Sequence, residues 1–238
     1  MKNFLEGKRA ALIDMDGVLY DSMKYHTLAW QRMMSEIGVE CNRDEFYLYE
    51  GMTGEATINL LYQRAFGHDC TPEEAKRLYA IKSEYFKGFG DREPMPAADL
   101  MLAALGKAGL RRVLVTGSAQ VSLLESLQAD YPGVFASGDR VTGLDVKHGK
   151  PDPEPYLKGL EIAGVPASEA IVIENAPLGV RAGKAAGIFT VAITTGPIHR
   201  EAFEKEGADV IFSSMPEAAD ALSKMATEIA GQYYSFFL

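Results

Sequence analysis

The sequence predicts an α/β protein whose core is a doubly wound, Rossmann-like parallel sheet, with a helical domain inserted into it. Beyond residue 93, short apolar runs alternate with segments of helical periodicity, which is the pattern of a parallel sheet. Between Asp21 and Glu93 the sequence has no strand pattern, so this stretch is interpreted as helices that directly follow the first strand. We therefore expect a core domain of residues 1–20 and 94–238 and a helical domain of residues 21–93.

The first strand is expected at Ala10–Ile13, an apolar run that ends at an acidic residue. In the next segment, residues 22–38, apolar side chains recur at helical spacing, with Asp21 or Ser22 as the N-cap and a glycine at the end. A proline followed by two acids marks the start of the last helix of the insertion. Further helices of the insertion are expected at residues 43–50, 55–66 and 72–89.

Pro94 and Pro96 mark the return to the core. Helices are expected at residues 97–108, 119–129, 154–163, 178–186 and 216–229. Strands are expected at residues 112–116, near 140, and at 170–174, 189–193 and 209–212. Because ligands of open parallel sheets bind beyond the carboxyl ends of the strands, the residues that follow the strands are the candidates for function. The aromatic segment 231–238 is expected to pack or to be disordered.

Composition excludes several classes of function. The chain has 238 residues, of which 47% are hydrophobic, and a formal net charge of −9. This acidity argues against binding of nucleic acid or anionic membranes through a broad basic surface. The sequence shows neither a membrane-spanning apolar run nor a secretory segment before the first strand, so we expect a cytoplasmic protein, as a monomer. Cys41 and Cys70 lack metal-ligand spacing and are expected to be free thiols.

Two acids, Asp14 and Asp16, stand at the end of the first strand, and Gly17 allows a sharp turn beneath whatever binds there. Like charges so close together need a cation, and Mg²⁺ takes oxygen ligands and also binds phosphate. The pattern indicates phosphoryl transfer. On its own, a pair of acids at this spacing is equally compatible with a polar strand-to-loop junction.

The complete string RAALIDMDGVLYDS, residues 9–22, resembles the haloacid dehalogenase superfamily of phosphohydrolases, in its branch similar to β-phosphoglucomutase. The resemblance extends from Ala10 to about Phe212. It implies that Asp14 attacks phosphorus to form an aspartyl-phosphate and that Asp16 is the general acid and base. It also implies that the helical domain, residues 21–93, is a cap over the active site.

VLVTGSAQ, residues 113–120, ends a strand in Thr116, Gly117 and Ser118 and opens a helix, whose amides and hydroxyl can hold an anion. The alternative is an ordinary serine N-cap. The resemblance implies that Thr116 binds the transferring phosphoryl group and that Ser118 assists. HGKPDPEPY, residues 148–156, is similar to the family string in which Lys150 neutralises charge between nucleophile and phosphate.

IVIENAPLGVRAG, residues 171–183, ends a strand in Glu174 and Asn175, and we expect both of them, together with Asp14 and Asp16, to ligate the Mg²⁺ ion. The family usually has two acids here, and the second binds Mg²⁺. An amide oxygen can also ligate Mg²⁺ but adds no charge, so Asn175 lowers the negative charge of the expected site. We expect Glu50 to restore that charge when the cap closes. The alternative is that Glu50 is a solvated helix-end acid.

The cap segment FYLYEGMTGEATIN, residues 46–59, corresponds to the substrate loop of β-phosphoglucomutases, where a lysine and an arginine help to bind a sugar phosphate. The lysine position is Glu50 and the arginine position is Gly54, so both cations are missing. Lys87 is expected to be either the remaining phosphate-binding cation of the cap or a solvated residue. His26 is expected either to bond near Asp16 or to make a local contact.

From these patterns we expect a Mg²⁺-dependent phosphohydrolase that acts on a small phosphorylated molecule, with no nucleic-acid or membrane partner. Loss of the cationic clamp argues against a mutase. Inorganic pyrophosphate fits an acidic cap that holds metal, and the combined motifs resemble an inorganic pyrophosphatase branch of the superfamily. The alternative is β-phosphoglucomutase or a sugar-phosphate phosphatase. A catalytically inactive binding protein would normally lack Asp14, Asp16 or Lys150, all of which are present.

Overall fold

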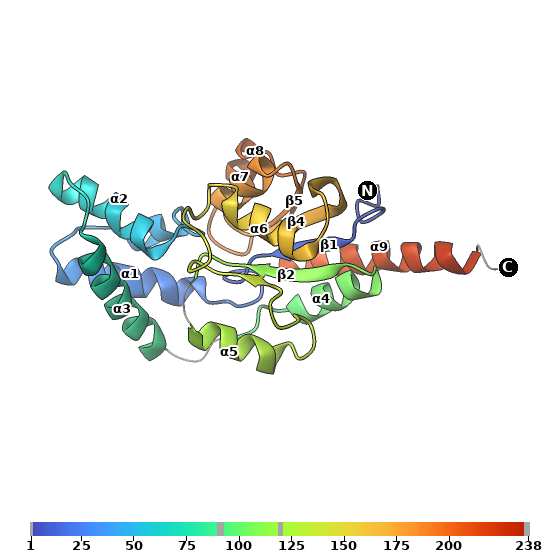
Figure 1. The fold of residues 1–238 in the computed structure, drawn as a ribbon, viewed down its shortest axis with the longest axis horizontal. Helices are drawn as coiled ribbons and strands as arrows, with labels where there is room; N and C mark the ends of the chain where they lie inside the picture. Colours follow the sequence, from blue (N-terminus) through green and yellow to red (C-terminus); the bar gives the residue numbers. More distant parts are fainter. Residues whose placement is uncertain (1, 90–92, 119–120, 236–238) are drawn as a thin grey trace.

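The computed structural model describes residues 2–89, 93–118 and 121–235 of the chain (Figure 1). A six-stranded sheet with the order β3-β2-β1-β4-β5-β6 lies at its centre, and neighbouring strands are parallel. The strands are β1 (Ala10–Ile13), β2 (Arg111–Val115), β3 (Arg140–Val141), β4 (Ala170–Glu174), β5 (Phe189–Ile193) and β6 (Val210–Phe212). The strand order reverses at β1, which confirms the expected doubly wound α/β fold.

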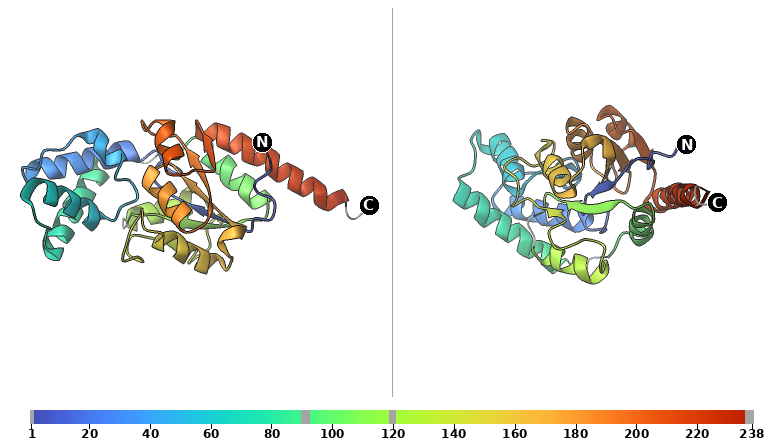
Figure 2. Two further views of the ribbon diagram at one scale, coloured as in Figure 1. Left: turned by 90° about the horizontal axis from the view of Figure 1, so that it is seen from above. Right: turned by 45° about the vertical axis from the view of Figure 1, so that its right-hand side comes forward.

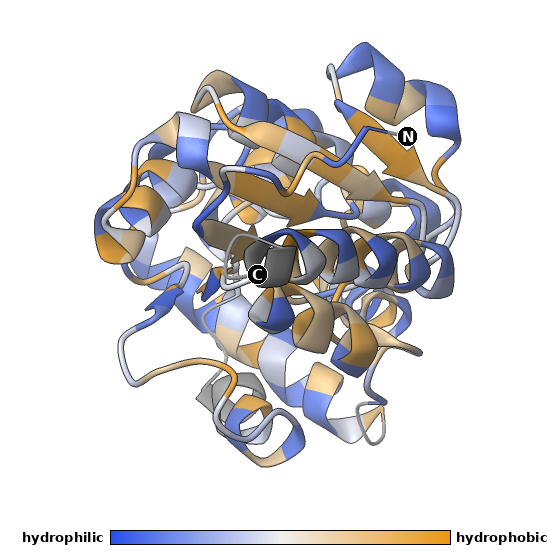
Figure 3. Cartoon of the chain, turned by 90° about the vertical axis from the view of Figure 1, so that its right-hand side faces the viewer, coloured by the Kyte–Doolittle hydropathy of each residue, from blue (hydrophilic) through white to orange (hydrophobic). Residues whose placement is uncertain are grey.

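The central strand β1 is fully buried because helices cover both faces of the sheet. Ala11 and Ile13 belong to the core cluster that contains residues of α4 (Ala98–Lys107) and α9 (Met215–Ser235). Ala10 and Leu12 belong to the cluster on the opposite face. A strand that is covered on both sides has a continuous apolar run rather than an alternating pattern, as the sequence of β1 does. Figure 3 shows these apolar strands at the centre and the polar outer surfaces of the helices.

The two helical layers come from different parts of the chain. One layer contains α6 (Glu154–Ala163), α7 (Pro177–Ala185) and the short α8 (Arg200–Lys205). The other layer contains α4, α5 (Val121–Asp130) and α9, and α9 packs along α4 (Figure 1). Within the part of the chain described, no helix is both long and apolar enough to cross a membrane.

The residues between β1 and α4 form a group of helices with a core of its own, which we call the helical insertion. It contains α1 (Met23–Glu36), the 3₁₀ helix η1 (Arg43–Tyr47), α2 (Gly54–Phe66) and α3 (Pro72–Gly88). The side chains of Thr53 and Thr71 accept hydrogen bonds from the first turns of α2 and α3, which fixes where these helices begin. Figure 2 shows the insertion at one end of the molecule, and residues that follow β1 and β2 face it.

The chain crosses between the sheet and the insertion at two adjacent segments. Tyr20 and Pro94 form an antiparallel bridge, and Asp21 N donates to Glu93 O at 3.0 Å. The carbonyl of Leu19 accepts from Met95 N at 2.8 Å. The two crossing segments are therefore paired with each other.

Several elements differ from the sequence predictions. The expected helix 43–50 is a short 3₁₀ helix, held by a capping box between Asn42 and Glu45. Helix α8 and the 3₁₀ turn at Ala167–Glu169 were missed because they are too short to show a period. Helix α9 continues to Ser235 instead of ending at Ile229. Ala119 and Gln120, the start of another expected helix, lie outside the described residues.

The burial of β1 on both faces predicts a large loss of stability when its central side chain is shortened. Leu12→Ala should lower the free energy of unfolding by about 2–5 kcal/mol, because it leaves a cavity between the sheet and α6. Urea unfolding followed by circular dichroism measures this loss. Leu144→Ala is the control, because Leu144 is 76% exposed and its truncation should change the free energy of unfolding by less than about 0.5 kcal/mol. Equal losses in the two variants would contradict the assignment of the core.

Candidate active site

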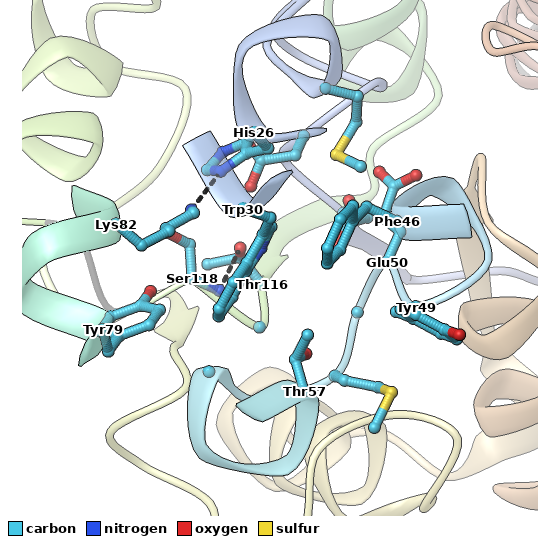
Figure 4. A pocket seen from close by; sticks show the side chains of 17 residues that line it. His26, Trp30, Phe46, Tyr49, Glu50, Thr57, Tyr79, Lys82, Thr116 and Ser118 are labelled. Atoms are coloured by element: carbon cyan, nitrogen blue, oxygen red, sulfur yellow. Dashed lines mark hydrogen bonds and ion pairs between the residues drawn. The ribbon is translucent and has the colours of Figure 1, made fainter. Parts of the chain in front are cut away.

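A cavity of about 60 Å³ lies where the carboxyl ends of β1 and β2 meet the helical insertion (Figure 4). Both parts of the chain supply its walls. The core contributes polar residues and the insertion contributes a largely aromatic wall with two charged groups. The lining includes Asp14, Asp16, Thr116, Gly117 and Ser118 from the core, and His26, Trp30, Phe46, Tyr49, Glu50, Thr57, Tyr79 and Lys82 from the insertion.

Asp14 directly follows β1 and forms a buried ion pair with Lys150. The Lys150 Nζ atom donates to Asp14 Oδ1 at 2.5 Å, to Glu174 Oε1 at 2.6 Å and to Val115 O at 3.1 Å. These three bonds use all three donors of the ammonium group. Burial raises the pKa of the Asp14 carboxyl, and the Lys150 charge acts against that rise. Burial disfavours the charged form of Lys150, but Asp14 and Glu174 outweigh it and raise the pKa of Lys150.

Glu174, at the end of β4, has both carboxylate oxygens occupied. Oε1 accepts from Lys150 and from the Tyr156 hydroxyl at 2.7 Å, and Oε2 accepts from the backbone N–H groups of Asn175 and Ala176 at 3.0 and 3.1 Å. Four donors match the ordinary capacity of a carboxylate. The sequence prediction assigned Glu174 to the metal, whereas this geometry gives it the role of holding Lys150. With four donors already bound, Glu174 has no free lone pair for a metal, contrary to that expectation.

Asp16 is held by a chain of polar side chains that runs into the helical insertion. Asp16 Oδ1 accepts from Ser22 Oγ at 2.6 Å and lies 3.0 Å from His26 Nε2, on α1. Lys82, on α3, lies 2.6 Å from His26 Nδ1 (Figure 4). A protonated Lys82 donates to Nδ1, which leaves the proton of a neutral imidazole on Nε2, facing Asp16. Burial raises the pKa of Asp16, but these partners outweigh it and lower that pKa below its ordinary value.

Lys82 is a buried cation of the insertion and was missed by the sequence prediction. Its side chain is 2% exposed, and its Nζ lies 5.2 Å from the ring centroids of Trp30 and Phe86. Burial lowers its pKa to about 7. The sequence prediction named Lys87 instead, but Lys87 is exposed, pairs with Glu84 at 2.7 Å and is not among the residues that line the cavity.

A signal for Lys82 was present in the sequence. Lys82 falls on the stripe of buried positions of α3, together with Ala75, Leu78 and Phe86. A lysine at helical spacing between apolar residues is usually buried against a partner, because an unpaired buried charge is unfavourable.

The core and the insertion meet at Glu50. Asn175 Nδ2 donates to Glu50 Oε1 at 3.0 Å, and both side chains are buried. Burial raises the pKa of Glu50 well above its ordinary value, and the nearby Asp14 carboxylate adds to the rise. The Asn175 amide also packs on Gly17, where an added Cβ would lie 1.9 Å from Nδ2 and where φ is +76°. Only glycine fits there without strain.

Thr116 and Ser118 follow β2 and face the same cavity. Thr116 Oγ1 accepts from Ser118 N at 3.0 Å. Between them, Gly117 is in close contact with the loop that follows Glu50, since an added Cβ would lie 2.7 Å from Gly51 O. A Cβ on Gly149 would similarly lie 2.8 Å from Thr53 N. Backbone therefore contacts backbone across this interface.

The donor set fits a hard divalent cation. Among the described residues, Asn175 Oδ1 is buried and has no hydrogen-bond partner, which is unusual for an amide oxygen. The carboxylates of Asp14, Asp16 and Glu50 line the cavity. Oxygen donors with an excess of negative charge suit Mg²⁺, so the expected magnesium site is compatible with the residues present.

Comparisons with known proteins identify the family to which the chain is similar. A family model for haloacid dehalogenase-like hydrolases matches residues 8–187. Hexitol phosphatase A of Escherichia coli is 31% identical over 187 residues, which cover 76% of this chain and 81% of that protein. 2-Deoxyglucose-6-phosphate phosphatase 1 of Saccharomyces cerevisiae is 28% identical and covers 87% of this chain and 88% of its own. A solved structure from Bacteroides vulgatus with a provisional beta-phosphoglucomutase name has a TM-score of 0.89 and 42% identity, covering 95% of this chain and 98% of its own.

The buried ammonium of Lys82 predicts a pH-dependent stability. Its pKa is about 7 in the folded chain against an ordinary value of 10.5, so between these values the unfolded chain binds more protons and the free energy of unfolding rises with pH. From pH 7 to 9.5 the native chain should gain about 3 kcal/mol relative to Lys82→Met, as measured by urea unfolding. Lys87→Met, at an exposed position, should keep the native slope. If the free energy of unfolding of Lys82→Met rises with pH as steeply as that of the native chain, Lys82 is not the cause of the pH dependence.

Proposed function

Because the chain belongs to the haloacid dehalogenase-like hydrolase family, we propose that it is a phosphohydrolase in which Asp14 is the nucleophile and Asp16 the general acid and base. One observation carries this proposal. The two acids line one cavity but have different partners, since Lys150 holds Asp14 and the chain of His26 and Lys82 holds Asp16. The Lys150 ammonium favours the charged form of Asp14, which the attack requires, and so acts against the burial that raises the pKa of this carboxyl.

The reaction proceeds in two steps. In the first, an Asp14 oxygen bonds to phosphorus while the bond from phosphorus to the leaving oxygen breaks, and Asp16 gives its proton to that oxygen. In the second, water attacks the phosphorus of the aspartyl-phosphate, Asp16 takes a proton from the water, and the bond to Asp14 breaks. The products are the leaving group and phosphate, and both acids return to their starting state.

The other polar residues of the cavity support these steps. Asp14, Asp16 and Asn175 would hold Mg²⁺, and Glu50 would add a carboxylate from the insertion. The ion, when bound, neutralises charge on the phosphoryl oxygens. Thr116 and Ser118 bind those oxygens, and Gly17 and Gly117 let the backbone approach them. The helical insertion acts as a cap that excludes water during the first step.

For the substrate we favour a phosphate monoester of a small sugar or polyol. Two of the relatives described above are named for hexitol and 2-deoxyglucose-6-phosphate as substrates. The wall of Trp30, Phe46 and Tyr49 supports this choice, because aromatic rings pack well against the apolar face of a sugar.

Inorganic pyrophosphate is a second candidate, and the hydrogen bond between Asn175 and Glu50 favours it. This contact brings an acid of the insertion to the core site, where mutases of the family have a lysine. An acidic wall suits a substrate that carries its own cations, as pyrophosphate does with Mg²⁺.

Initial rates with Mg²⁺ separate these candidates. The substrates are sorbitol 6-phosphate, 2-deoxyglucose 6-phosphate, β-glucose 1-phosphate and pyrophosphate. We expect kcat/KM for the phosphate monoesters to exceed kcat/KM for pyrophosphate at least about a hundredfold, which corresponds to roughly 2.7 kcal/mol. The opposite order would favour pyrophosphate as the substrate. Asp14→Asn should abolish turnover, because it removes the attacking carboxylate. Phosphate release by Asp14→Asn at the native rate would refute the proposed mechanism.

Glu50 provides a separate prediction about metal binding. Glu50→Gln should raise the Mg²⁺ concentration for half-maximal rate about tenfold, because the variant removes a negative charge from the site. Calorimetric titration with Mg²⁺ alone should show the same weakening. Glu55→Gln, an exposed acid on α2, is the matched control and should bind Mg²⁺ like the native chain. An unchanged Mg²⁺ affinity in Glu50→Gln would exclude a role for Glu50 at the metal.

A further inference from the structure

Tyr156 is a fully buried tyrosine that the proposed reaction does not use. It lies in the first turn of α6, and its ring packs in the core cluster with Leu12, Val113 and Val115. A buried phenol needs a hydrogen-bond partner. That partner is Glu174 Oε1, which accepts from the hydroxyl at 2.7 Å.

Tyr156 also contacts the other half of the same ion pair. The Nζ atom of Lys150 lies 5.1 Å from the centroid of the Tyr156 ring, within the range of a cation–π interaction. Lys150 donates to the same Glu174 oxygen, Oε1, at 2.6 Å. The phenol ring and its hydroxyl therefore contact both charges of the pair between Lys150 and Glu174.

The surroundings of Glu174 leave its carboxylate little freedom. A Cβ on Gly179 would lie 1.9 Å from Glu174 Oε1, so the backbone of α7 closes over this side chain. Two backbone N–H groups hold the second oxygen. Among the described residues, the side chains that donate hydrogen bonds to Glu174 are Lys150 and Tyr156.

From these contacts we infer that Tyr156 is a positioning residue: through Glu174 and its ring face it fixes the Lys150 ammonium, which in turn holds Asp14 Oδ1. The inference rests on the proposed phosphoryl transfer to Asp14. An ammonium group with a fixed position leaves the second Asp14 oxygen outside the ion pair and keeps the carboxylate oriented for attack. Correct orientation of a nucleophile is a large part of catalysis, and a small displacement lowers the rate.

The test compares Tyr156→Phe, Glu174→Gln and the double variant. Tyr156→Phe keeps the ring beneath Lys150 and removes only the hydroxyl, so folding, checked by thermal unfolding, should be retained. We expect kcat for p-nitrophenyl phosphate to fall about tenfold with KM within about twofold. In the Glu174→Gln background the same change should cost less than about twofold, because Tyr156 acts through Glu174.

A second readout needs no turnover. Calorimetric affinity for tungstate, an inorganic mimic of phosphate, should weaken about tenfold in Tyr156→Phe and follow the same non-additive pattern. Tyr85→Phe is the matched control, because that hydroxyl also bonds to a carboxylate, Glu36, and neither of the two residues lines the cavity. It should keep the native rate and affinity.

Two results would overturn the inference: native affinity and rate in Tyr156→Phe, or losses that add in the double variant. Failure of the proposed function looks different. In that case the native chain would bind tungstate without hydrolysing p-nitrophenyl phosphate or the substrates above, and the tungstate affinities alone would decide whether Tyr156 positions Lys150.

Discussion

The structure depends on one buried group, the ammonium of Lys150, which joins three strand ends. Its three donors bind the carboxylate after β1, the carbonyl at the end of β2 and the carboxylate at the end of β4. Burying one of these charges alone would be strongly unfavourable, because water is replaced by an apolar interior. The charges are tolerated only together. Asp14, the proposed nucleophile, is therefore held by the same interaction that holds the loop of Lys150 to the sheet.

The two acids of the site draw their positive charge from different parts of the chain. Asp14 is paired within the core, whereas Asp16 is paired through His26 with Lys82, which lies on the insertion. Their pKa values move in opposite directions, upward for Asp14 and downward for Asp16. The position of α1 and α3 thus determines the electrostatic environment of Asp16, while that of Asp14 is set by the sheet and its loops.

Most of the fold and part of the site could be predicted from the sequence, for identifiable reasons. Buried strands such as β4 are continuous apolar runs, and Asp14, Asp16 and Thr116 stand directly after such runs. Lys82 was missed because its partner His26 is distant in sequence and because its place on the apolar stripe of α3, which Lys87 does not share, was overlooked. The full set of hydrogen bonds to Glu174 could not be foreseen, because the Tyr156 hydroxyl and the Lys150 ammonium reach it only in the folded chain. Short elements such as α8 have no measurable period.

The close approach of Gly51 to Gly117, and of Thr53 to Gly149, has a consequence for how this scaffold can diversify. These contacts between the two parts are made by main chain, and they do not depend on the side chains of the aromatic wall. Tyr49, Met52 and Tyr79 line the cavity and are only partly buried, so they can be exchanged without loss of these contacts. A family that keeps its glycines fixed and varies these three positions could acquire new leaving-group preferences by few mutations, with the chemistry at Asp14 left untouched.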